Sequence, residues 1–273
     1  RIGDFPAHMN QTFRLGIDIG STASKCIMLA DGKDIVAKSL IPVGAGTSGP
    51  QRAISQVLEN AGKAREEMSY ILATGYGRNS LEEFADQQMS ELSCHAKGAS
   101  FLFPEVRTVI DIGGQDVKVL QIENGVMTNF VMNDKCAAGT GRFLDVMARV
   151  LEVKVEDLGT LGAQSTKNVG ISSTCTVFAE SEVISQLAQD TDKRDIINGI
   201  HHSVANRVAG LAHRVGIRDQ VVMTGGVAQN IGIVSALEEQ LGHTIHTSPL
   251  TQYNGALGAA LFAYQKYLKE QKG

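Results

Sequence analysis

The sequence predicts an α/β protein with two duplicated halves, each built on a mixed sheet, and a ligand-binding cleft between the halves. Three observations lead to this prediction: a gapless internal repeat, a matching pair of hairpin turns, and helical periodicity after each group of strands. The chain has 273 residues, of which 43% are hydrophobic, so it is long enough to bury the core of one large or two small domains.

The repeat is carried by two segments, Ile17 to Lys25 and Ile110 to Lys118, which both begin Ile-Asp-Ile-Gly and align without a gap. The likeness continues into two turn signals at the same spacing, Asp31-Gly32 and Asn124-Gly125. Asp-Gly and Asn-Gly are preferred in two-residue β-hairpins. Each half is therefore predicted to open with a strand, a tight turn, a strand, a hairpin and a third strand.

The remaining elements follow from periodicity and turn residues. Around the hairpins we expect strands at Cys26–Leu29, Ile35–Leu40, Val119–Ile122 and Met127–Met132. Apolar residues at helical spacing predict helices at Pro50–Asn60, Phe143–Leu151, Val177–Ala188, Ile196–Val215 and Gly255–Leu268. The segment Arg1 to His8 has no periodicity and is left out of the fold. We expect a first lobe over residues 12–106, a second over 107–253, and a last helix, 254–270, that returns to the first.

The repeated Asp-x-Gly turn has the character of a phosphate site. Glycine lets the backbone approach a ligand closely, and successive turn amides form an anion-binding concavity. Two facing turns would grip a polyphosphate, and Asp18 and Asp111 would hold Mg²⁺, largely through water. A turn-capping role for both aspartates is the alternative. The residues expected near the phosphates are Gly20, Ser21, Thr22, Lys25, Gly113 and Gly114, although Lys25 can equally point to solvent.

A third glycine turn supports the prediction of a nucleotide-binding site. The apolar run Val221 to Thr224 predicts a buried strand, and Gly225-Gly226 ends it. A turn without side chains lets a flat purine lie against the backbone, so we expect adenine at these two glycines. The closing helix begins Gly255 to Ala260 with small residues, which suit close helix contact at a hinge.

A competing motif and several function classes are disfavoured. Gly44 to Gly49 matches G-x-G-x-x-G, but Pro42 and Pro50 bracket it and its strand is not the first of a βαβ unit, so a loop is the better interpretation. No G-x-x-x-x-G-K-[ST] motif occurs. The net charge of −4 gives no support to nucleic-acid binding. No secretory signal opens the chain and no apolar run approaches roughly 20 residues, so we expect a cytoplasmic protein that does not enter membranes.

The glycine turns together resemble the superfamily of actin, hexokinase and heat-shock ATPases, which implies a duplicated actin-like ATPase fold. Within it the chain resembles the activators of 2-hydroxyacyl-CoA dehydratases, and among them those that serve 2-hydroxyglutaryl-CoA dehydratase. The resemblance runs from about Phe13 to Tyr267. It is carried by Gly75–Arg78, Glu91–Ala96, Asn133–Asp145 and Ser172–Glu182.

The resemblance implies a function. Such a protein hydrolyses ATP with Mg²⁺, takes an electron from ferredoxin or flavodoxin and passes it at low potential to the dehydratase in anaerobic amino-acid fermentation. Asp18, Asp111 and Gln115 would be catalytic, with Gln115 positioning the attacking water. Cys136 and Cys175 would hold a [4Fe-4S] cluster that bridges a homodimer.

The sequence around these two cysteines suits that role. Cys136 precedes a small-residue turn and a helix, and Cys175 precedes a helix that Ser172, Ser173 or Thr174 can cap. Helix N-termini stabilise thiolates. A cubane needs four thiolates and each chain offers two, so a twofold dimer supplies the set.

Some alternatives remain. Cys26 lies in an apolar strand and is expected to be an inert buried thiol. Cys94 lies beside a histidine, and a cluster within one chain that uses Cys94 remains an alternative. The histidines His95, His201, His202 and His213 show no metal-ligand spacing and are expected to be structural or exposed, two of them on a surface-like helix. A sugar or acyl kinase, for which Asp116 could be the catalytic aspartate, is the second functional hypothesis. An actin-like assembly protein is the third, and it would leave Cys136 and Cys175 without a role.

Overall fold

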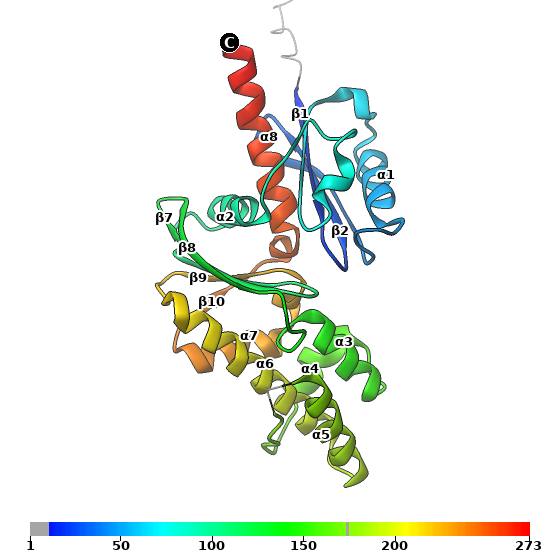
Figure 1. Ribbon diagram of the computed structural model, residues 1–273, viewed down its shortest axis with the longest axis vertical. Helices are drawn as coiled ribbons and strands as arrows, with labels where there is room; N and C mark the ends of the chain where they lie inside the picture. Colours follow the sequence, from blue (N-terminus) through cyan, green and yellow to red (C-terminus); the bar gives the residue numbers. More distant parts are fainter. Residues whose placement is uncertain (1–10, 173–174) are drawn as a thin grey trace, which may run out of the picture. The chain divides into compact units, whose positions relative to one another are not determined.

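The computed structural model describes residues 11–172 and 175–273, drawn as a ribbon in Figure 1. The segment Arg1 to His8, which the sequence excluded from the fold, lies outside the described residues. The chain divides into two compact units, Arg1–Gly98 with Gly255–Gly273, and Ala99–Asn254. No helix of the described part combines the length and the apolar character needed to cross a membrane.

The first unit is built on a five-stranded mixed sheet of order β3-β2-β1-β4-β5. Its strands are β1 (Phe13–Ile19), β2 (Ser24–Ala30), β3 (Asp34–Ile41), β4 (Met68–Thr74) and β5 (Gln87–Gln88). β1, β2 and β3 form an antiparallel meander, and β4 and β5 add on parallel to β1.

The second unit repeats this topology, with the order β10-β9-β6-β7-β8. Its strands are β6 (Thr108–Ile112), β7 (Val117–Glu123), β8 (Val126–Asn133), β9 (Val221–Thr224) and β10 (Ile245–His246). Here too the first three strands are antiparallel and the last two are parallel to the first. The register irregularities match as well, after Met28 in the first unit and after Gln121 in the second.

The two hairpins have the predicted turns. Asp31 and Gly32 have φ of 53° and 78°, and Asn124 and Gly125 have φ of 51° and 78°. Two consecutive left-handed residues define a type I′ turn, whose twist matches that of the flanking strands. The repeat read from the sequence is thus confirmed as a structural duplication.

The helices of the first unit are α1 (Gly49–Ala61), α2 (Glu91–Leu102), which runs on into the second unit, and α8 (Asn254–Lys272), with the 3-10 turns η1 (Arg65–Glu67) and η2 (Arg78–Leu81). α1 packs on β2 and β3. The small residues of α8 allow close approach, because a methyl group on Gly258 would overlap the carbonyl of Cys94 in α2. The Arg14 guanidinium of β1 lies 4.7 Å and 4.3 Å from the ring centres of Tyr264 and Tyr267, which fastens α8 to the sheet.

The helices of the second unit are α3 (Gly141–Val150), α4 (Leu158–Gly162), α5 (Thr176–Ala188), α6 (Lys193–Val215) and α7 (Ile231–Leu241), with the 3-10 turns η3 (Val155–Asp157), η4 (Gly226–Gln229) and η5 (Pro249–Tyr253). α6 packs on β7, β8 and α7, and Figure 1 shows α6 and α7 on one face of the sheet. In the described chain the first unit has one α-helix between its third and fourth strands, whereas the second has α3 to α6. The segment from α3 to α5 is therefore an addition to the second unit.

Candidate functional site

Both Asp-x-Gly turns close in the same way. The Gly20 N–H donates to the carbonyl of Ala23 at 2.9 Å, and the Gly113 N–H donates to the carbonyl of Asp116 at 3.0 Å. These two amides are thus used inside the turns. The next amides, those of Ser21, Thr22, Gly114 and Gln115, make no hydrogen bond to other described residues. Unpaired amides in successive positions favour an anion, so each turn is chemically suited to phosphate oxygens.

A buried aspartate precedes each turn. Asp18 and Asp111 are 4% and 2% exposed, and each faces the lysine at the matching repeat position. Lys25 Nζ lies 3.6 Å from Asp18 Oδ2, and Lys118 Nζ lies 3.6 Å from Asp111 Oδ2. Lys25 therefore turns toward the aspartate rather than into solvent. A carboxylate that only caps a turn needs no cation beside it. The two lysines therefore favour ligand binding over the turn-capping alternative.

The fourth strand of each unit ends in Thr-Gly beside the aspartate, a repeat that the sequence reasoning did not use. In the sheet register Asp18 pairs with Thr74 and Asp111 pairs with Thr224. The glycines that follow, Gly75 and Gly225, have φ of 95° and 86°, and a methyl group on either would fall against the aspartate carboxylate. A Thr-Gly pair after a buried strand in each half was the available signal.

The Gly225-Gly226 turn has the open backbone that the purine prediction requires. The Gly225 N–H donates to the carbonyl of Thr251 at 3.1 Å, which fixes the turn. A methyl group on Gly226 would meet nothing within 4 Å, so its backbone borders open space. The prediction of adenine at this turn stays a prediction.

The competing glycine motif, Gly44 to Gly49, packs against the first Asp-x-Gly turn. The Ala45 N–H donates to the carbonyl of Gly20 at 2.9 Å, and a methyl group on Gly44 would overlap the backbone of Ser21. The preceding strand, β3, pairs only antiparallel, with β2. A dinucleotide fingerprint requires a parallel βαβ unit, so the loop interpretation is the one that the sheet supports.

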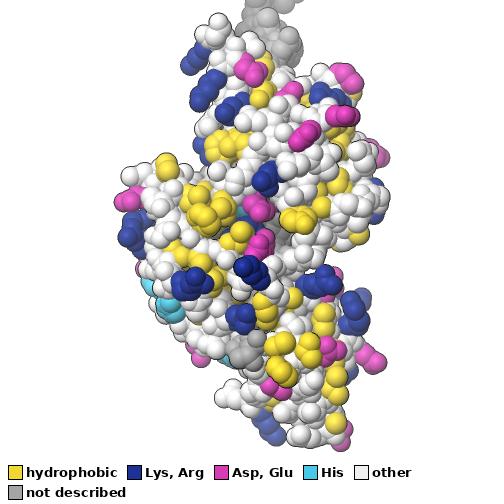
Figure 2. Space-filling model, in the orientation of Figure 1, with side chains coloured by type: hydrophobic (Ala, Val, Ile, Leu, Met, Phe, Trp, Pro, Cys, Tyr) yellow, Lys and Arg dark blue, Asp and Glu magenta, His cyan; other side chains and the backbone are white. Residues whose placement is uncertain are grey.

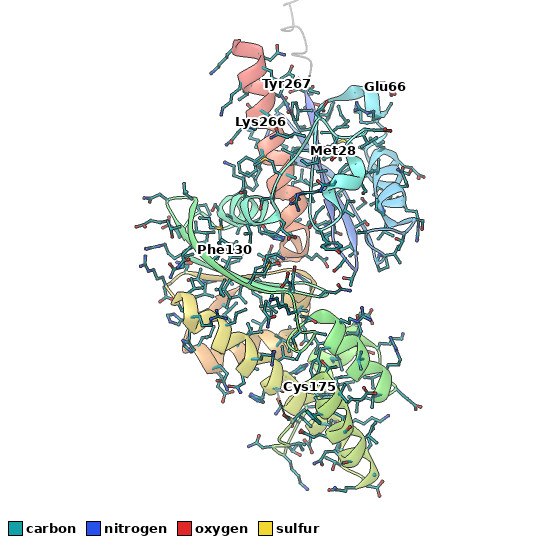
Figure 3. All side chains as sticks on the ribbon, viewed as in Figure 1. Met28, Glu66, Phe130, Cys175, Lys266 and Tyr267 are labelled. Carbon is teal, nitrogen blue, oxygen red and sulfur yellow. The ribbon has the colours of Figure 1, made fainter. Side chains whose placement is uncertain are left out.

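The four cysteines divide into two pairs by burial. Cys26 and Cys94 are fully buried, and burial raises the pKa of each thiol to about 12. Cys136 and Cys175 are partly exposed, and Cys175 is labelled in Figure 3. A thiol must lose its proton to ligate iron, so the second pair is the chemically suitable one. In the described residues no three His, Cys, Asp or Glu side chains are grouped to hold a metal ion.

Cys136 lies in the loop between β8 and α3, and the start of α3 is bound to the second glycine turn. The Gly141 N–H donates to the carbonyl of Gly113, and the Arg142 N–H donates to the carbonyl of Gly114, both at 2.9 Å. The backbone amides of the first two residues of α3 are therefore hydrogen-bonded to the two glycines that are expected to contact phosphate. This connection could not be read from the sequence, because the two segments are far apart along the chain.

Cys175 is itself the N-cap of α5, with φ −158° and ψ 137°. The prediction that a residue before Cys175 caps the helix is wrong for Ser172, because the N-cap position is that of Cys175. The Ser172 N–H donates to Glu182 in α5, and Ser173 and Thr174 lie outside the described residues. Free helical amides follow Cys175, so its sulfur lies at the positive end of the α5 dipole.

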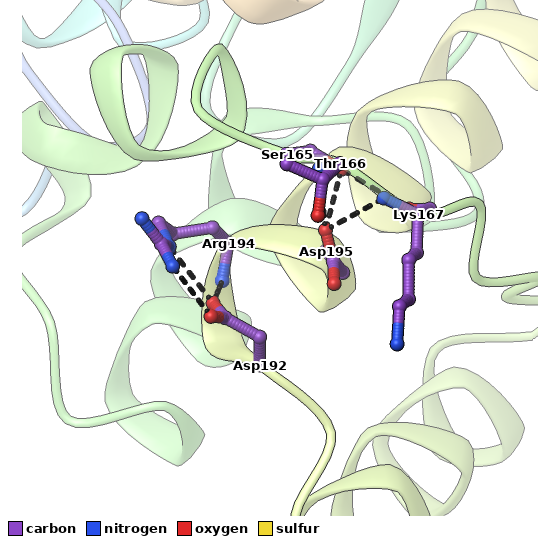
Figure 4. A network of polar contacts seen from close by, with 6 residues as sticks. All are labelled: Ser165, Thr166, Lys167, Asp192, Arg194 and Asp195. Carbon is purple, nitrogen blue, oxygen red and sulfur yellow. Dashed lines mark hydrogen bonds and ion pairs between the residues drawn. The ribbon is translucent and has the colours of Figure 1, made fainter.

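The loop before Cys175 is fastened to α6 (Figure 4). Asp195 Oδ1 accepts hydrogen bonds from the hydroxyl of Ser165 at 2.8 Å, the N–H of Thr166 at 2.9 Å and the N–H of Lys167 at 3.1 Å. The two backbone donors and the hydroxyl lower the pKa of the Asp195 carboxyl. Asp192 caps the same helix by accepting from the Arg194 N–H at 2.8 Å.

The histidines have structural positions. His201 is 1% exposed, which corrects the expectation of a surface-like helix, and burial together with neighbouring His202 lowers its pKa to about 4. Its ring contacts the Asn230 amide at 3.3 Å. His95 is buried near Asp18, since a methyl group on Gly255 would lie 2.6 Å from Asp18 Oδ2 and 3.2 Å from His95 Nε2.

The topology defines the class of protein. Two mixed five-stranded sheets with duplicated strand order form the two-lobed α/β fold of actin-like ATPases and sugar kinases. The ROK family glucokinase from Streptomyces griseus shares this fold with a TM-score of 0.56 at 15% identity, covering 94% of this chain and 100% of the kinase. A likeness at this identity shows the fold alone.

The chain belongs to the BadF/BadG/BcrA/BcrD ATPase family, whose profile matches residues 15–263. This membership favours the ATPase over the kinase and assembly hypotheses. The chain is 74% identical to the (R)-2-hydroxyglutaryl-CoA dehydratase activating ATPase of Acidaminococcus fermentans, over 94% of this chain and 99% of the relative. The crystal structure of that component matches with a TM-score of 0.92.

A second relative is the 2-hydroxyisocaproyl-CoA dehydratase activator of Clostridioides difficile. It is 53% identical over 95% of this chain and 98% of the relative. Its structure with bound ADPNP matches with a TM-score of 0.93, covering 96% of this chain and 97% of that structure.

Proposed function

We propose that this chain is the ATP-dependent activator of a 2-hydroxyacyl-CoA dehydratase, and specifically of (R)-2-hydroxyglutaryl-CoA dehydratase. The observation that carries the proposal is a pair of partly exposed cysteines, Cys136 in the loop before α3 and Cys175 at the start of α5. The start of α3 is bound by hydrogen bonds to a candidate phosphate turn. The 74% identity to a relative of that name, over nearly the whole of both chains, supports the choice of partner.

The proposed nucleotide site uses both duplicated turns. ATP would meet the free amides of Ser21 and Thr22 from one turn and of Gly114 and Gln115 from the other, with Lys25 at a phosphate and adenine at Gly225-Gly226. Mg²⁺ would be held through water by Asp18 and Asp111, whose buried carboxylates with one lysine each fit a hydrated cation. The ion would supply charge neutralisation at the phosphates, and Gln115 would orient the attacking water.

The proposed cluster site uses Cys136 and Cys175. Their partial exposure and the position of Cys175 at a helix N-terminus fit thiolate ligands, whereas the buried thiols of Cys26 and Cys94 do not. Two such cysteines per chain fit one [4Fe-4S] cluster shared by a homodimer. The cluster would supply one-electron chemistry.

A surface beside Cys175 supports the dimer. Val177 and Phe178 follow it and are 66% and 63% exposed, and Ile184 of the same helix is 52% exposed. Hydrophobic side chains gather over α3 and α5 in Figure 2. Exposed apolar side chains in one place mark a surface that another protein covers.

The physiological setting is part of the proposal. A cytoplasmic donor, ferredoxin or flavodoxin, would reduce the activator, and the dehydratase would receive the electron. Nucleotide turnover would act on α3 through the hydrogen bonds from Gly141 to Gly113 and from Arg142 to Gly114, because a change in the turn must move or break them.

The test is iron analysis of anaerobically purified cysteine variants. Wild-type protein is expected to be brown, dimeric and to contain about two iron atoms per chain. Cys136→Ala and Cys175→Ala should each lose the colour and weaken the dimer, whereas Cys26→Ala should keep both. Four irons in an isolated monomer would refute the shared cluster, and full iron content in both Cys136→Ala and Cys175→Ala would refute the site.

A further inference from the structure

Lys118 is a buried cation that the proposed chemistry does not use. Its side chain is 3% exposed, and its Nζ lies 2.7 Å from Asp116 Oδ1 and 3.6 Å from Asp111 Oδ2. Removing an ammonium group from water is unfavourable unless carboxylates and hydrogen bonds replace the solvent. Lys118 has such partners, and both lie at the second glycine turn.

The Asp111 carboxylate is held at both oxygens. The Thr224 hydroxyl donates to Asp111 Oδ1 at 2.8 Å, and Lys118 lies on the side of Oδ2. The orientation of this carboxylate is therefore fixed before any ligand arrives. In the first unit the hydroxyl of the matching threonine, Thr74, donates instead to the carbonyl of Met89 at 2.9 Å. Asp18 therefore does not receive the hydrogen bond that Asp111 receives from Thr224.

The second partner of Lys118 has no counterpart in the first unit. At the position that matches Asp116 the first turn has Ala23, and Lys25 faces Asp18 alone with 17% of its side chain exposed. The first set, Asp18 with Lys25, is neutral, whereas the second set, Asp111 and Asp116 with Lys118, carries one negative charge. Asp116 is 26% exposed at its side chain and lies over the turn, since a methyl group on Gly113 would be 3.1 Å from its Oδ1.

We propose that Lys118 is a positioning residue that fixes Asp111 and Asp116 as the cation side of the nucleotide site, while the lysine of the first turn serves the phosphate side. A net negative, preorganised pair of carboxylates attracts a hydrated divalent cation, and a neutral, more exposed turn leaves its lysine available to an anion. This inference rests on the proposed nucleotide site and divides the labour between its two turns.

Removing Lys118 should have an effect that loss of a phosphate contact does not have. In Lys118→Met the two carboxylates lose their counter-ion, so binding of Mn²⁺ to the nucleotide complex should be unchanged or tighter. The kcat of ATP hydrolysis at saturating metal should nevertheless fall at least about tenfold, because Asp111 and Asp116 lose their geometry.

Lys25→Met is the matched control. It should weaken the binding of ATP measured without metal at least about tenfold, because a charged phosphate contact is lost. Mn²⁺ affinity of the nucleotide-loaded protein should not fall, because no carboxylate is removed.

The experiment measures Mn²⁺ binding by electron paramagnetic resonance, metal-free nucleotide affinity by fluorescent ATP, and hydrolysis, for wild type and both variants. The inference is overturned if Lys118→Met keeps wild-type kcat, or if it loses metal-free nucleotide affinity as Lys25→Met does. If Lys118→Met does not fold, Asp116→Asn decides. Removing one partly exposed carboxylate should raise the metal concentration for half-maximal hydrolysis several-fold, and a wild-type metal requirement would overturn the inference.

A failure of the nucleotide site itself is distinguishable. In that case Asp18→Asn and Asp111→Asn would hydrolyse ATP at the wild-type rate. If these two variants lose activity while Lys118→Met does not, the site stands and only the role of Lys118 falls.

Discussion

The two halves of the molecule share their strands and turns but differ in what joins the third strand to the fourth. In the first half β3 leads through α1 to β4, whereas in the second β8 leads through α3, α4, α5 and α6 to β9. The aspartate, lysine, turn and Thr-Gly pair occur in both halves. Cys175 lies within the additional segment, α3 to α5, and Cys136 lies in the loop that leads into that segment. The comparison teaches that the glycine turns were duplicated together with the strands, and that the second half has three further helices, α3 to α5, beside its own turn.

The largest expected effect tests what the halves share. Asp18→Asn and Asp111→Asn should each reduce ATP hydrolysis by about an order of magnitude or more, because both buried carboxylates would position Mg²⁺. Steady-state phosphate release with excess Mg²⁺ measures this. If one variant retains the wild-type rate, the two turns do not serve one nucleotide.

Much of this duplication could be predicted from the sequence. The Asp-Gly and Asn-Gly turns have the predicted left-handed backbone, and all five predicted helices are present with shifted ends. Local signals sufficed there, because turn chemistry and periodicity act over a few residues. β4 and α7 were not predicted. The bonds from Gly141 and Arg142 to the second turn depend on how distant segments pack, and Lys118 gives no local sign of its two carboxylate partners.

The next effect tests how closely α8 packs against α2 in the first half. Gly258→Ala should destabilise the protein by about 1–3 kcal/mol, because its methyl group would overlap the Cys94 carbonyl and force α8 away from α2. Gly210→Ala is the control. It lies exposed in α6 with nothing within 4 Å, so it should be neutral or stabilising by up to about 1 kcal/mol. Urea unfolding compares the two, and equal stabilities would show that α8 does not need the small residue.

The smallest effect tests how the added segment is held. His201 of α6 lies against Gly162 of α4, and its pKa is lowered to about 4 from 6.5 by burial and by His202. The unfolded chain therefore binds a proton that the folded chain does not. Stability should fall as pH falls from 6.5 toward 4, by at most about 1.4 kcal/mol per unit, and should be fully present above 6.5.

Free energies of unfolding measured across this pH range test whether stability falls as the pH falls. His201→Gln should be less stable at neutral pH but should lose this part of the pH dependence. His202→Gln, at a partly exposed neighbour, should retain it. An unchanged slope in His201→Gln would assign the acid sensitivity to other groups.

The central claim is that the nucleotide turn and the cysteine segment of the second unit act together. The direct test is an anaerobic dehydratase assay with activator that has been reduced beforehand and no further reductant. Reduced protein with ATP should activate the dehydratase, whereas reduced protein with ADP, or reduced Asp111→Asn with ATP, should bind without activating it. A ligand shifts an equilibrium only by its different affinities for the two states. Equal activation with ADP and ATP would contradict the coupling.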